Sequence, residues 1–192
     1  MNIDLALLHR AMMHYEEDGC HFATVPYLVD PDIMEFTCPP GVIDKRLTHF
    51  DGKQYVASAE QSFLQMEKEG KLDGDDLIPP MLALTPCYRD EYILDEVHLN
   101  IFLKLEIFHY NPEEVRGVNW AYFWAESMQS FFAEEGLVTH IIATNIGYDV
   151  ITEGGLELGS FGYRTSPKGV QYVYATGLAE PRASIAISEK NG

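Results

Sequence analysis

Positively charged residues are scarce in this chain. Thirteen lysines and arginines stand against thirty aspartates and glutamates, which leaves a formal net charge of −17 over 192 residues. Proteins that bind nucleic acid over a large surface use cationic side chains to displace counterions from phosphates. We therefore expect no large nucleic-acid interface, and we interpret most acidic clusters as solvated surface that favours solubility.

Cysteines are few, and long apolar runs are absent. Cys20, Cys38 and Cys87 are odd in number and far apart, without a C-x-x-C pair, so the sequence supports neither a disulfide framework nor a zinc knuckle. No segment reaches the apolar length needed to cross a bilayer. The N-terminus, MNIDLALLHRAMMHYEEDG, has acids and histidines where a signal peptide needs a cleavage site. We expect reduced thiols, no membrane partner and a cytoplasmic location.

The chain is long enough to bury one core, and its composition is 46% hydrophobic. Apolar spacing predicts helices over 3–18 and 112–135, and a strand followed by a helix within GKQYVASAEQSFLQMEKEG. Further strands are predicted within 20–30, as a pair within 83–110, and at 137–144, 147–152, 155–160 and 170–175, before a last helix that Gly177 begins. The order predicts an α+β fold, an antiparallel β-sheet flanked by helices, as a single domain over residues 1–192.

The strand pair within ALTPCYRDEYILDEVHLNIFLKLEIFHY contains charged residues. Arg89 and Glu91 are two positions apart, as are Lys104 and Glu106, and alternate residues of a strand point to the same face. Charged side chains rarely lie in strands unless a partner or a ligand offsets their desolvation. The residues alone leave two explanations open: ion pairs within the sheet, or a binding site.

Five short motifs, in chain order, resemble those of the class II aminoacyl-tRNA synthetases. FATVPYLVD after an amphipathic helix is similar to motif 1, which forms the dimer interface in that family. TPCYRDE followed by FLKLE resembles motif 2, and TGLAEPRASIAI resembles motif 3 in its seryl-type form. SAE at 58–60 is similar to the Thr-x-Glu element of the seryl and threonyl branch, and ELGS at 157–160 to the Glu-x-Ser-Ser element. The resemblance implies a class II synthetase-like catalytic domain and a homodimer.

The resemblance also implies a site for ATP. Activating a carboxylic acid requires in-line attack at the α-phosphorus, and arginine binds phosphate through two parallel hydrogen bonds. By resemblance, Arg89 contacts the α-phosphate and Arg182 the γ-phosphate, and these two are the expected catalytic residues. Glu91 is expected to accept a hydrogen bond from the adenine amino group.

Three further positions complete the expected nucleotide site. Glu157 and Ser160 offer hard oxygen ligands for Mg²⁺ bound to the phosphates. Gly177, as the expected start of the last helix, adds free backbone N–H groups that favour an anion.

The amino-acid substrate is assigned to the other strand of motif 2, where Lys104 and Glu106 share a face, and to the Thr-x-Glu element. In the family, the matching Glu of motif 2 and the Thr-x-Glu element hold the substrate's ammonium group. The resemblance therefore implies a substrate-binding set of Ser58, Glu60, Lys104 and Glu106.

Some positions depart from the seryl-type pattern. Tyr163 and Arg164 stand where that pattern has Asn shortly after the Glu-x-Ser-Ser element, and Leu103 replaces the Glu of FEKVE. The identity of the amino acid is therefore open. Arg164 has two interpretations, a contact to a substrate carboxylate or an ordinary surface salt bridge. A zinc centre is not expected.

The principal hypothesis is a stand-alone, synthetase-like ligase that forms an aminoacyl-adenylate and passes the acyl group to an acceptor other than tRNA. The acceptor is open: a small amine, a carrier-protein thiol or a modified base. No anticodon-binding domain or coiled-coil arm is recognised, and the connection between the motif 2 strands carries Asp90, Asp95 and Glu96, which would repel RNA. Two alternatives remain, a catalytically inactive binding or regulatory paralogue, and tRNA charging with a recognition domain from another chain.

Overall fold

The helices and strands of this protein confirm the predicted α+β class. The structure is a computed structural model that describes residues 3–38, 47–72, 78–90, 94–112 and 116–189. Its helices are α1 (Leu5–Glu17), α2 (Pro31–Thr37), α3 (Ala59–Lys68), α4 (Trp120–Glu134) and α5 (Arg182–Glu189). Its strands are β1 (His21–Phe22), β2 (Leu28–Val29), β3 (Gln54–Tyr55), β4 (Met81–Tyr88), β5 (Ile101–Tyr110), β6 (Thr139–Ala143), β7 (Tyr148–Thr152), β8 (Glu157–Thr165) and β9 (Gln171–Glu180).

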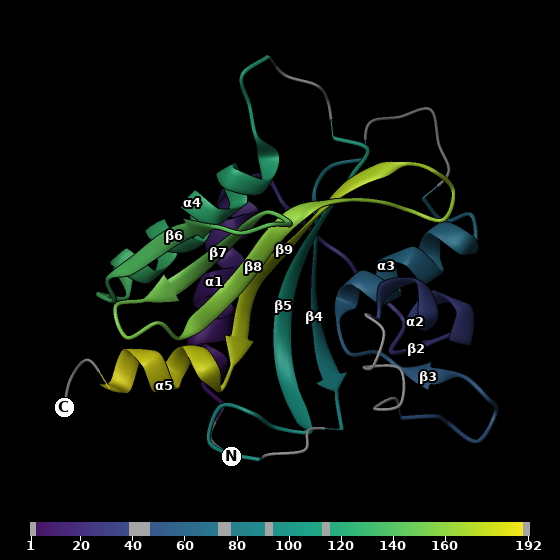
Figure 1. Ribbon diagram of the computed structural model, residues 1–192, viewed down its shortest axis with the longest axis horizontal. Coiled ribbons are helices and arrows are strands. Elements are labelled where there is room, and N and C mark those ends of the chain that lie inside the picture. The colour runs from purple at the N-terminus through teal and green to yellow at the C-terminus, as the bar shows by residue number, and fades with distance from the viewer. Residues whose placement is uncertain (1–2, 39–46, 73–77, 91–93, 113–115, 190–192) are drawn as a thin grey trace.

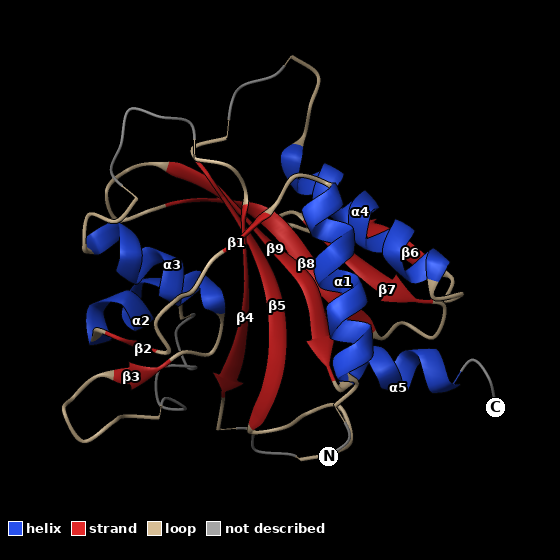
Figure 2. Ribbon diagram, turned by 180° about the vertical axis from the view of Figure 1, so that it is seen from behind, coloured by secondary structure: helices blue, strands red, loops and turns tan. Residues whose placement is uncertain are grey.

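Seven strands form one sheet, in the order β1-β4-β5-β9-β8-β7-β6. β1 pairs with β4 in parallel, and the other neighbouring pairs are antiparallel. β2 and β3 form a separate antiparallel pair. Figure 1 shows α2, α3 and this small pair beside β4, and Figure 2 shows α1 and α4 lying across the opposite side. The predicted antiparallel sheet flanked by helices is therefore confirmed, with one parallel pair at its edge.

The sheet carries an apolar layer on each face, because alternate residues of a strand point to opposite sides. On one face, Leu82 and Ile107 pack with the buried residues of α1 and α4. On the other face, Phe108 of β5 stacks on Phe63 of α3, with ring centroids 4.8 Å apart. Burial on both faces explains why β4 and β5 have nearly continuous apolar sequences.

Helix α1 lies where the apolar spacing predicts it. Asp4 caps its first turn by accepting a hydrogen bond from the backbone N–H of Leu7, at 2.9 Å. Leu8 and Tyr15 belong to its buried stripe. The chain leaves the helix through Gly19, whose φ of 95° is a conformation that residues with a side chain rarely adopt.

Helix α4 begins later than predicted. The acids after Pro112 suggested a first helical turn there, but the helix starts at Trp120, where the Asn119 side chain accepts a hydrogen bond from the N–H of Tyr122 at 3.2 Å. Gly117 has a φ of 85°, which no helix accommodates. The predicted range 112–135 is therefore wrong at its start and right at its end.

The predicted helix start at Gly177 is wrong. Gly177 lies inside β9, at a bulge where Leu105 pairs with Leu178 and Glu106 with Thr176, and α5 begins only at Arg182. A Cβ at Gly177 would lie 3.1 Å from the ring of Tyr15, and the Tyr15 hydroxyl donates a hydrogen bond to the Gly177 carbonyl at 2.8 Å. The absence of a side chain at Gly177 therefore leaves room for Tyr15 of α1, and the Gly177 N–H does not lie at a helix N-terminus.

Two buried carboxylates attach α3 to the sheet. Glu60 and Glu67 lie about two turns apart on the helix. The Glu67 carboxylate accepts hydrogen bonds from the hydroxyls of Tyr110, at 2.7 Å, and Ser166, at 2.5 Å. The Glu60 carboxylate accepts one from the hydroxyl of Tyr172, at 2.7 Å. These directional contacts fix α3 against β5 and β9.

The cysteines form no disulfide among the described residues, and Cys20 and Cys87 are buried. Burial raises the pKa of both thiols, that of Cys87 to about 12, which keeps them protonated and unreactive. Within the described ranges, no helix has the length and apolar character needed to cross a membrane.

Candidate active site

A cavity of about 430 Å³ lies where α3 and the segment before it face β5, β8 and β9. Its lining includes eight of the ten predicted site residues, namely Ser58, Glu60, Arg89, Lys104, Glu106, Glu157, Ser160 and Arg182. Of the other two, Gly177 is not part of the lining, and Glu91 lies outside the described residues. Segments far apart in the sequence therefore meet in one place, as the motif order implied.

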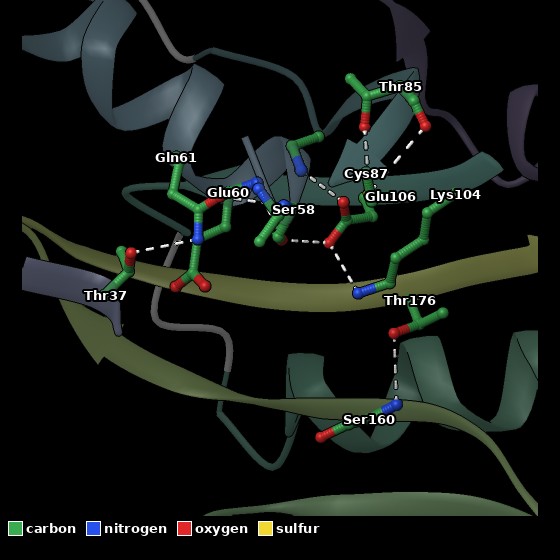
Figure 3. Close-up of polar contacts among 12 residues, drawn as sticks. Thr37, Ser58, Glu60, Gln61, Thr85, Cys87, Lys104, Glu106, Ser160 and Thr176 are labelled. Atoms are coloured by element: carbon green, nitrogen blue, oxygen red, sulfur yellow. Dashed lines mark hydrogen bonds and ion pairs between the residues drawn. The ribbon is translucent and has the colours of Figure 1, made fainter. Parts of the chain in front are cut away.

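Lys104 and Glu106 form an ion pair along one strand. Both side chains point to the same face of β5, and Lys104 Nζ lies 2.9 Å from Glu106 Oε1 (Figure 3). The two side chains are 16% and 8% exposed, so water screens this pair less than a surface pair. The pair also lines the cavity, so the ion pair and the binding site are compatible explanations of these charges.

The Glu106 carboxylate also caps α3. The Ser58 hydroxyl donates to Glu106 Oε1 at 2.6 Å, and the backbone N–H of Ala59 donates to Oε2. Ser58 is the N-cap of α3, where unpaired N–H groups and the helix dipole favour a negative charge. Three partners therefore hold Glu106: a hydroxyl, a helix N-terminus and Lys104.

Glu60, predicted to bind the substrate ammonium, has an internal partner. Arg164 Nη1 donates hydrogen bonds to both Glu60 carboxylate oxygens, at 2.8 and 2.7 Å. The Arg164 guanidinium lies over the ring of Tyr174, 4.2 Å from its centroid. Burial lowers the pKa of Arg164, but the Glu60 charge and hydrogen bonds outweigh burial and raise it. The predicted salt bridge of Arg164 is therefore present, but it is partly buried at the wall of the cavity and does not lie on the open surface.

Arg89 extends from the end of β4 into the cavity. Its Nη2 donates to the carbonyl of Ala57 at 3.4 Å, and its guanidinium lies 5.0 Å from the centroid of the Phe102 ring. Phe102 is two residues before Lys104 and four before Glu106 on β5, so its ring lies on the same face of the strand as these two side chains. Sequence reasoning missed Phe102, although its spacing of two from Lys104 was a usable signal.

Arg182 and Glu157 meet at the far side of the cavity. Arg182 Nη1 donates to the backbone carbonyl of Glu157 at 3.1 Å, and the Glu157 side chain is exposed. Ser160, three residues further along β8, donates its backbone N–H to the Thr176 hydroxyl at 3.3 Å. The Ser160 hydroxyl and the Glu157 carboxylate therefore line the same cavity as two arginines.

The oxygen donors at this end suit magnesium better than a transition metal. Glu157 forms no ion pair with any residue in the described ranges. Within these ranges, no group of three or more His, Cys, Asp or Glu side chains is placed to hold a metal ion. Mg²⁺ commonly takes one or two protein ligands together with phosphate oxygens and water, which fits a single free carboxylate and a hydroxyl.

Glu180 is a further acid that sequence reasoning missed. It is fully buried at the end of β9 and lines the cavity. Its Oε2 accepts a hydrogen bond from the Ser184 hydroxyl at 2.6 Å, whereas its Oε1 has no partner among the described residues. Burial raises the pKa of this carboxyl group. The sequence signal was an acid at the end of an apolar strand.

Comparison of the sequence with known proteins gives one partial match. No protein-family model matches the chain. A serine-tRNA ligase from Sinorhizobium medicae is 35% identical over 94 residues, which covers 45% of this chain and 22% of the ligase. The chain thus matches about a fifth of the length of this curated relative.

Solved structures match nearly the whole chain in fold. A pyrrolysyl-tRNA synthetase from Desulfitobacterium hafniense has a TM-score of 0.74 at 16% identity, covering 97% of this chain and 69% of that one. A seryl-tRNA synthetase from Pyrococcus horikoshii has a TM-score of 0.74 at 23% identity, covering 95% and 49%. With the partial sequence match, these likenesses show that the chain has the fold of the class II aminoacyl-tRNA synthetase catalytic domain.

Proposed function

We propose that this protein activates an amino acid with ATP, forming an aminoacyl-adenylate and releasing pyrophosphate. The observation that carries the proposal is the convergence in one cavity of two arginines, Arg89 and Arg182, with the Lys104–Glu106 pair. The fold adds support, because the similar Pyrococcus enzyme is described in complex with ATP and a similar serine-tRNA ligase from Naegleria fowleri in complex with AMP.

Arg89 is the proposed ligand of the α-phosphate. Its guanidinium contacts Ala57 and Phe102 without a carboxylate partner among the described residues, so it is available to a phosphate. When the substrate carboxylate attacks the α-phosphorus, negative charge grows on the oxygens of that phosphate. A positioned arginine stabilises this charge more in the transition state than in the ground state, which is the condition for catalysis.

Arg182 and Glu157 are proposed to bind and neutralise the phosphates that leave as pyrophosphate. Arg182 is the proposed γ-phosphate ligand. Glu157 and Ser160 would hold Mg²⁺, which when bound neutralises phosphate charge. The Phe102 ring offers an apolar face on which the adenine can stack. Glu91 stays a proposed adenine ligand that lies outside the described residues.

The acyl acceptor is proposed to be something other than tRNA. The acids Asp90, Asp95 and Glu96, which lie in the motif 2 connection, are exposed. Asp95 is bound to its neighbour His98, whose ring nitrogen lies 2.8 Å from the carboxylate. An acidic connection opposes the approach of a polyanion. A small amine, a carrier-protein thiol or a modified base remain the candidate acceptors.

We also propose a cytoplasmic homodimer. The motif 1 region exposes apolar side chains that a second copy would cover: Leu5 is 67% exposed, Met13 46% and Phe22 45%. The lack of a disulfide among the three cysteines in the described residues favours a reducing compartment.

The deciding experiment is a pyrophosphate-exchange screen across the twenty amino acids, with mass spectrometry of the adenylate. Exchange dependent on one or a few amino acids is expected. Arg89→Ala is the active-site control, and Arg116→Ala is a matched surface control, since Arg116 is exposed and does not line the cavity. No exchange with any amino acid would favour the inactive paralogue, and acyl transfer to added tRNA would favour the charging of tRNA.

A further inference from the structure

The connection between β4 and β5 contains a tight turn that joins Asp95 to His98. The Asp95 carboxylate accepts hydrogen bonds from the backbone N–H groups of Val97, at 2.9 Å, and His98, at 2.7 Å. The backbone N–H of Asp95 in turn donates to the His98 carbonyl at 3.3 Å. These backbone contacts hold the turn independently of the His98 imidazole.

The same carboxylate also binds the imidazole ring. His98 Nδ1 lies 2.9 Å from Asp95 Oδ1 and 2.8 Å from Oδ2. The hydrogen bond from His98 is the main reason why the pKa of Asp95 lies below its ordinary value, so the carboxylate is ionised at neutral pH. An ionised carboxylate only accepts hydrogen bonds, so a neutral His98 carries its proton on Nδ1 and its lone pair on Nε2. This nitrogen has no partner among the described residues.

His98 lines the cavity at the end where Arg89 lies. The backbone N–H of Arg89 donates to the carbonyl of Asn100 at 2.9 Å, so the connection leaves the sheet and returns to it at these two residues. His98 is two residues before Asn100, and it lines the cavity together with Arg89 and Phe102. In an aminoacyl-adenylate, one oxygen joins the acyl carbon to the α-phosphate. A base at the end of the cavity that holds the proposed ligand of this phosphate is therefore close to the acyl carbon.

The other proton acceptors of the cavity are occupied or out of reach. Glu60 and Glu106 form ion pairs with cations of the cavity wall. Glu157 is the proposed ligand of Mg²⁺, and Glu180 is fully buried. His98 is the only histidine among the described residues that line the cavity, and imidazole is the side chain best suited to accept a proton near neutral pH.

We propose that His98 is the general base of acyl transfer and that Asp95 positions it. His98 Nε2 takes the proton from the nucleophilic atom of the acceptor while that atom attacks the acyl carbon of the adenylate. The bond between this carbon and the phosphate oxygen then breaks, and AMP leaves with the electron pair. His98 holds the proton as an imidazolium paired with Asp95 and releases it to water.

This inference rests on the proposed function and concerns its second step. It restricts the acceptor to a nucleophile that reaches the cavity with a proton to lose, because a nucleophile that is already ionised gains nothing from a base. The His98 side chain is 52% exposed, so an acceptor can reach it from solution while the adenylate occupies the cavity.

The test supplies synthetic glycyl-adenylate, and the adenylate of any amino acid that the exchange screen identifies, together with one of two thiols. At about pH 8, N-acetylcysteamine is mostly protonated, whereas trifluoroethanethiol is largely ionised because its fluorine atoms withdraw electrons. His98→Ala is expected to slow the protein-catalysed transfer to N-acetylcysteamine by roughly 10²-fold or more, the usual contribution of a general base. Transfer to trifluoroethanethiol should slow much less. A residue that only maintained the fold would affect both thiols equally.

Two further measurements follow the proton. Added imidazole should restore part of the rate of His98→Ala, because it replaces the missing base. Asp95→Asn keeps an oxygen for the turn but offers an N–H to Nδ1, which favours the tautomer with its proton on Nε2. Long-range ¹H–¹⁵N NMR of the ring should show this shift, and transfer to N-acetylcysteamine should slow with it.

His140→Ala is the matched control, since His140 is exposed and does not line the cavity, and both transfer rates should stay unchanged. Three results would overturn the inference: no transfer by the wild-type protein above the rate without protein, equal slowing of the two thiols in His98→Ala, or a wild-type His98 ring with its proton on Nε2. Transfer that depends on His98 without any pyrophosphate exchange would refute the proposed adenylate formation alone. Exchange together with any of the three results would refute the inference alone.

Discussion

The guanidinium of Arg164 binds both carboxylate oxygens of Glu60 through a single nitrogen, although 104 residues separate the two in the chain. This contact joins β8 to α3 at the wall of the cavity. It also gives Glu60 a structural role that the motif resemblance did not imply.

Arg164→Met should destabilise the protein, because the buried Glu60 carboxylate keeps only the Tyr172 hydroxyl as a partner. Breaking a fully buried pair costs about 3–5 kcal/mol, and the 37% exposure of the Arg164 side chain reduces the expected loss to roughly 2 kcal/mol. Urea unfolding measures it. The double variant Arg164→Met/Glu60→Gln should recover part of the loss, and purely additive effects would contradict the pairing.

Arg89→Ala should lower the pyrophosphate-exchange rate by roughly 10²-fold or more, because one preorganised donor to the α-phosphate is lost. Folding should survive, since Arg89 contributes one long hydrogen bond to Ala57. Arg89→Lys should recover little activity, because a point charge does not reproduce bidentate geometry. Unchanged exchange with a lowered melting temperature would remove Arg89 from the catalytic residues.

Gly177→Ala should destabilise the protein by about 1–3 kcal/mol, the usual cost of overpacking a core. The new Cβ would lie 3.1 Å from the Tyr15 ring and 3.2 Å from the Leu105 carbonyl oxygen. Gly154→Ala is the matched control, because its Cβ would have only an ordinary contact, 3.7 Å from Thr152. Thermal unfolding gives the melting temperature of each variant, and equal melting temperatures for the two would contradict the close packing of Tyr15.

The free energy of unfolding should fall as the pH drops from 6.5 towards 4, in part through His109. Burial lowers the pKa of His109 to about 4, and its Nδ1 has no hydrogen-bond partner among the described residues. In this pH window the unfolded chain binds a proton at His109 that the folded protein does not. The contribution of His109 to the free energy of unfolding is therefore fully present above pH 6.5 and is lost as the pH falls towards 4.

The variant His109→Gln isolates this contribution, because other groups titrate in the same window. The wild type should lose up to roughly 3 kcal/mol more than the variant between pH 7 and 4. Urea unfolding at several pH values measures the difference. If the free energies of unfolding of the two proteins changed in parallel with pH, His109 would titrate alike in the folded and the unfolded state, which would contradict the prediction.

Light scattering at micromolar concentration should give the mass of a dimer. Leu5→Asp, which puts a charge on the exposed apolar side of α1, should shift the mass towards the monomer. Val138→Asp is the matched control, since Val138 is also exposed, at 56%, but lies outside the motif 1 region. A monomeric mass for the wild-type protein would end the proposal.

The sequence predicted those features that depend on local periodicity. The two-residue spacing of Lys104 and Glu106 placed both on one strand face, and the apolar stripe through Leu8 and Tyr15 predicted α1. Eight of the ten predicted site residues line one cavity, and they were found together because the motif resemblance supplied long-range relationships that periodicity does not contain.

The failures have physical causes that one segment alone does not reveal. Gly177 was interpreted as a helix start because glycine is common near helix ends. In the structure it leaves room for the ring of Tyr15, which is 162 residues away in the chain. The Glu60–Arg164 contact joins α3 to β8 and has no local signal. Helix α2 was missed because no element was predicted for the residues that follow PYLVD, although Asp30 before Pro31 is typical of a helix N-terminus.

The attachment of α3 through Glu60 and Glu67 has a mechanical consequence. Each carboxylate engages a tyrosine on a different strand, Tyr172 on β9 and Tyr110 on β5. A slide or a rotation of the helix by one residue would break both contacts at once. We therefore expect this wall of the cavity to stay in place on the strands beneath it, and any tightening around the proposed nucleotide to come from another wall.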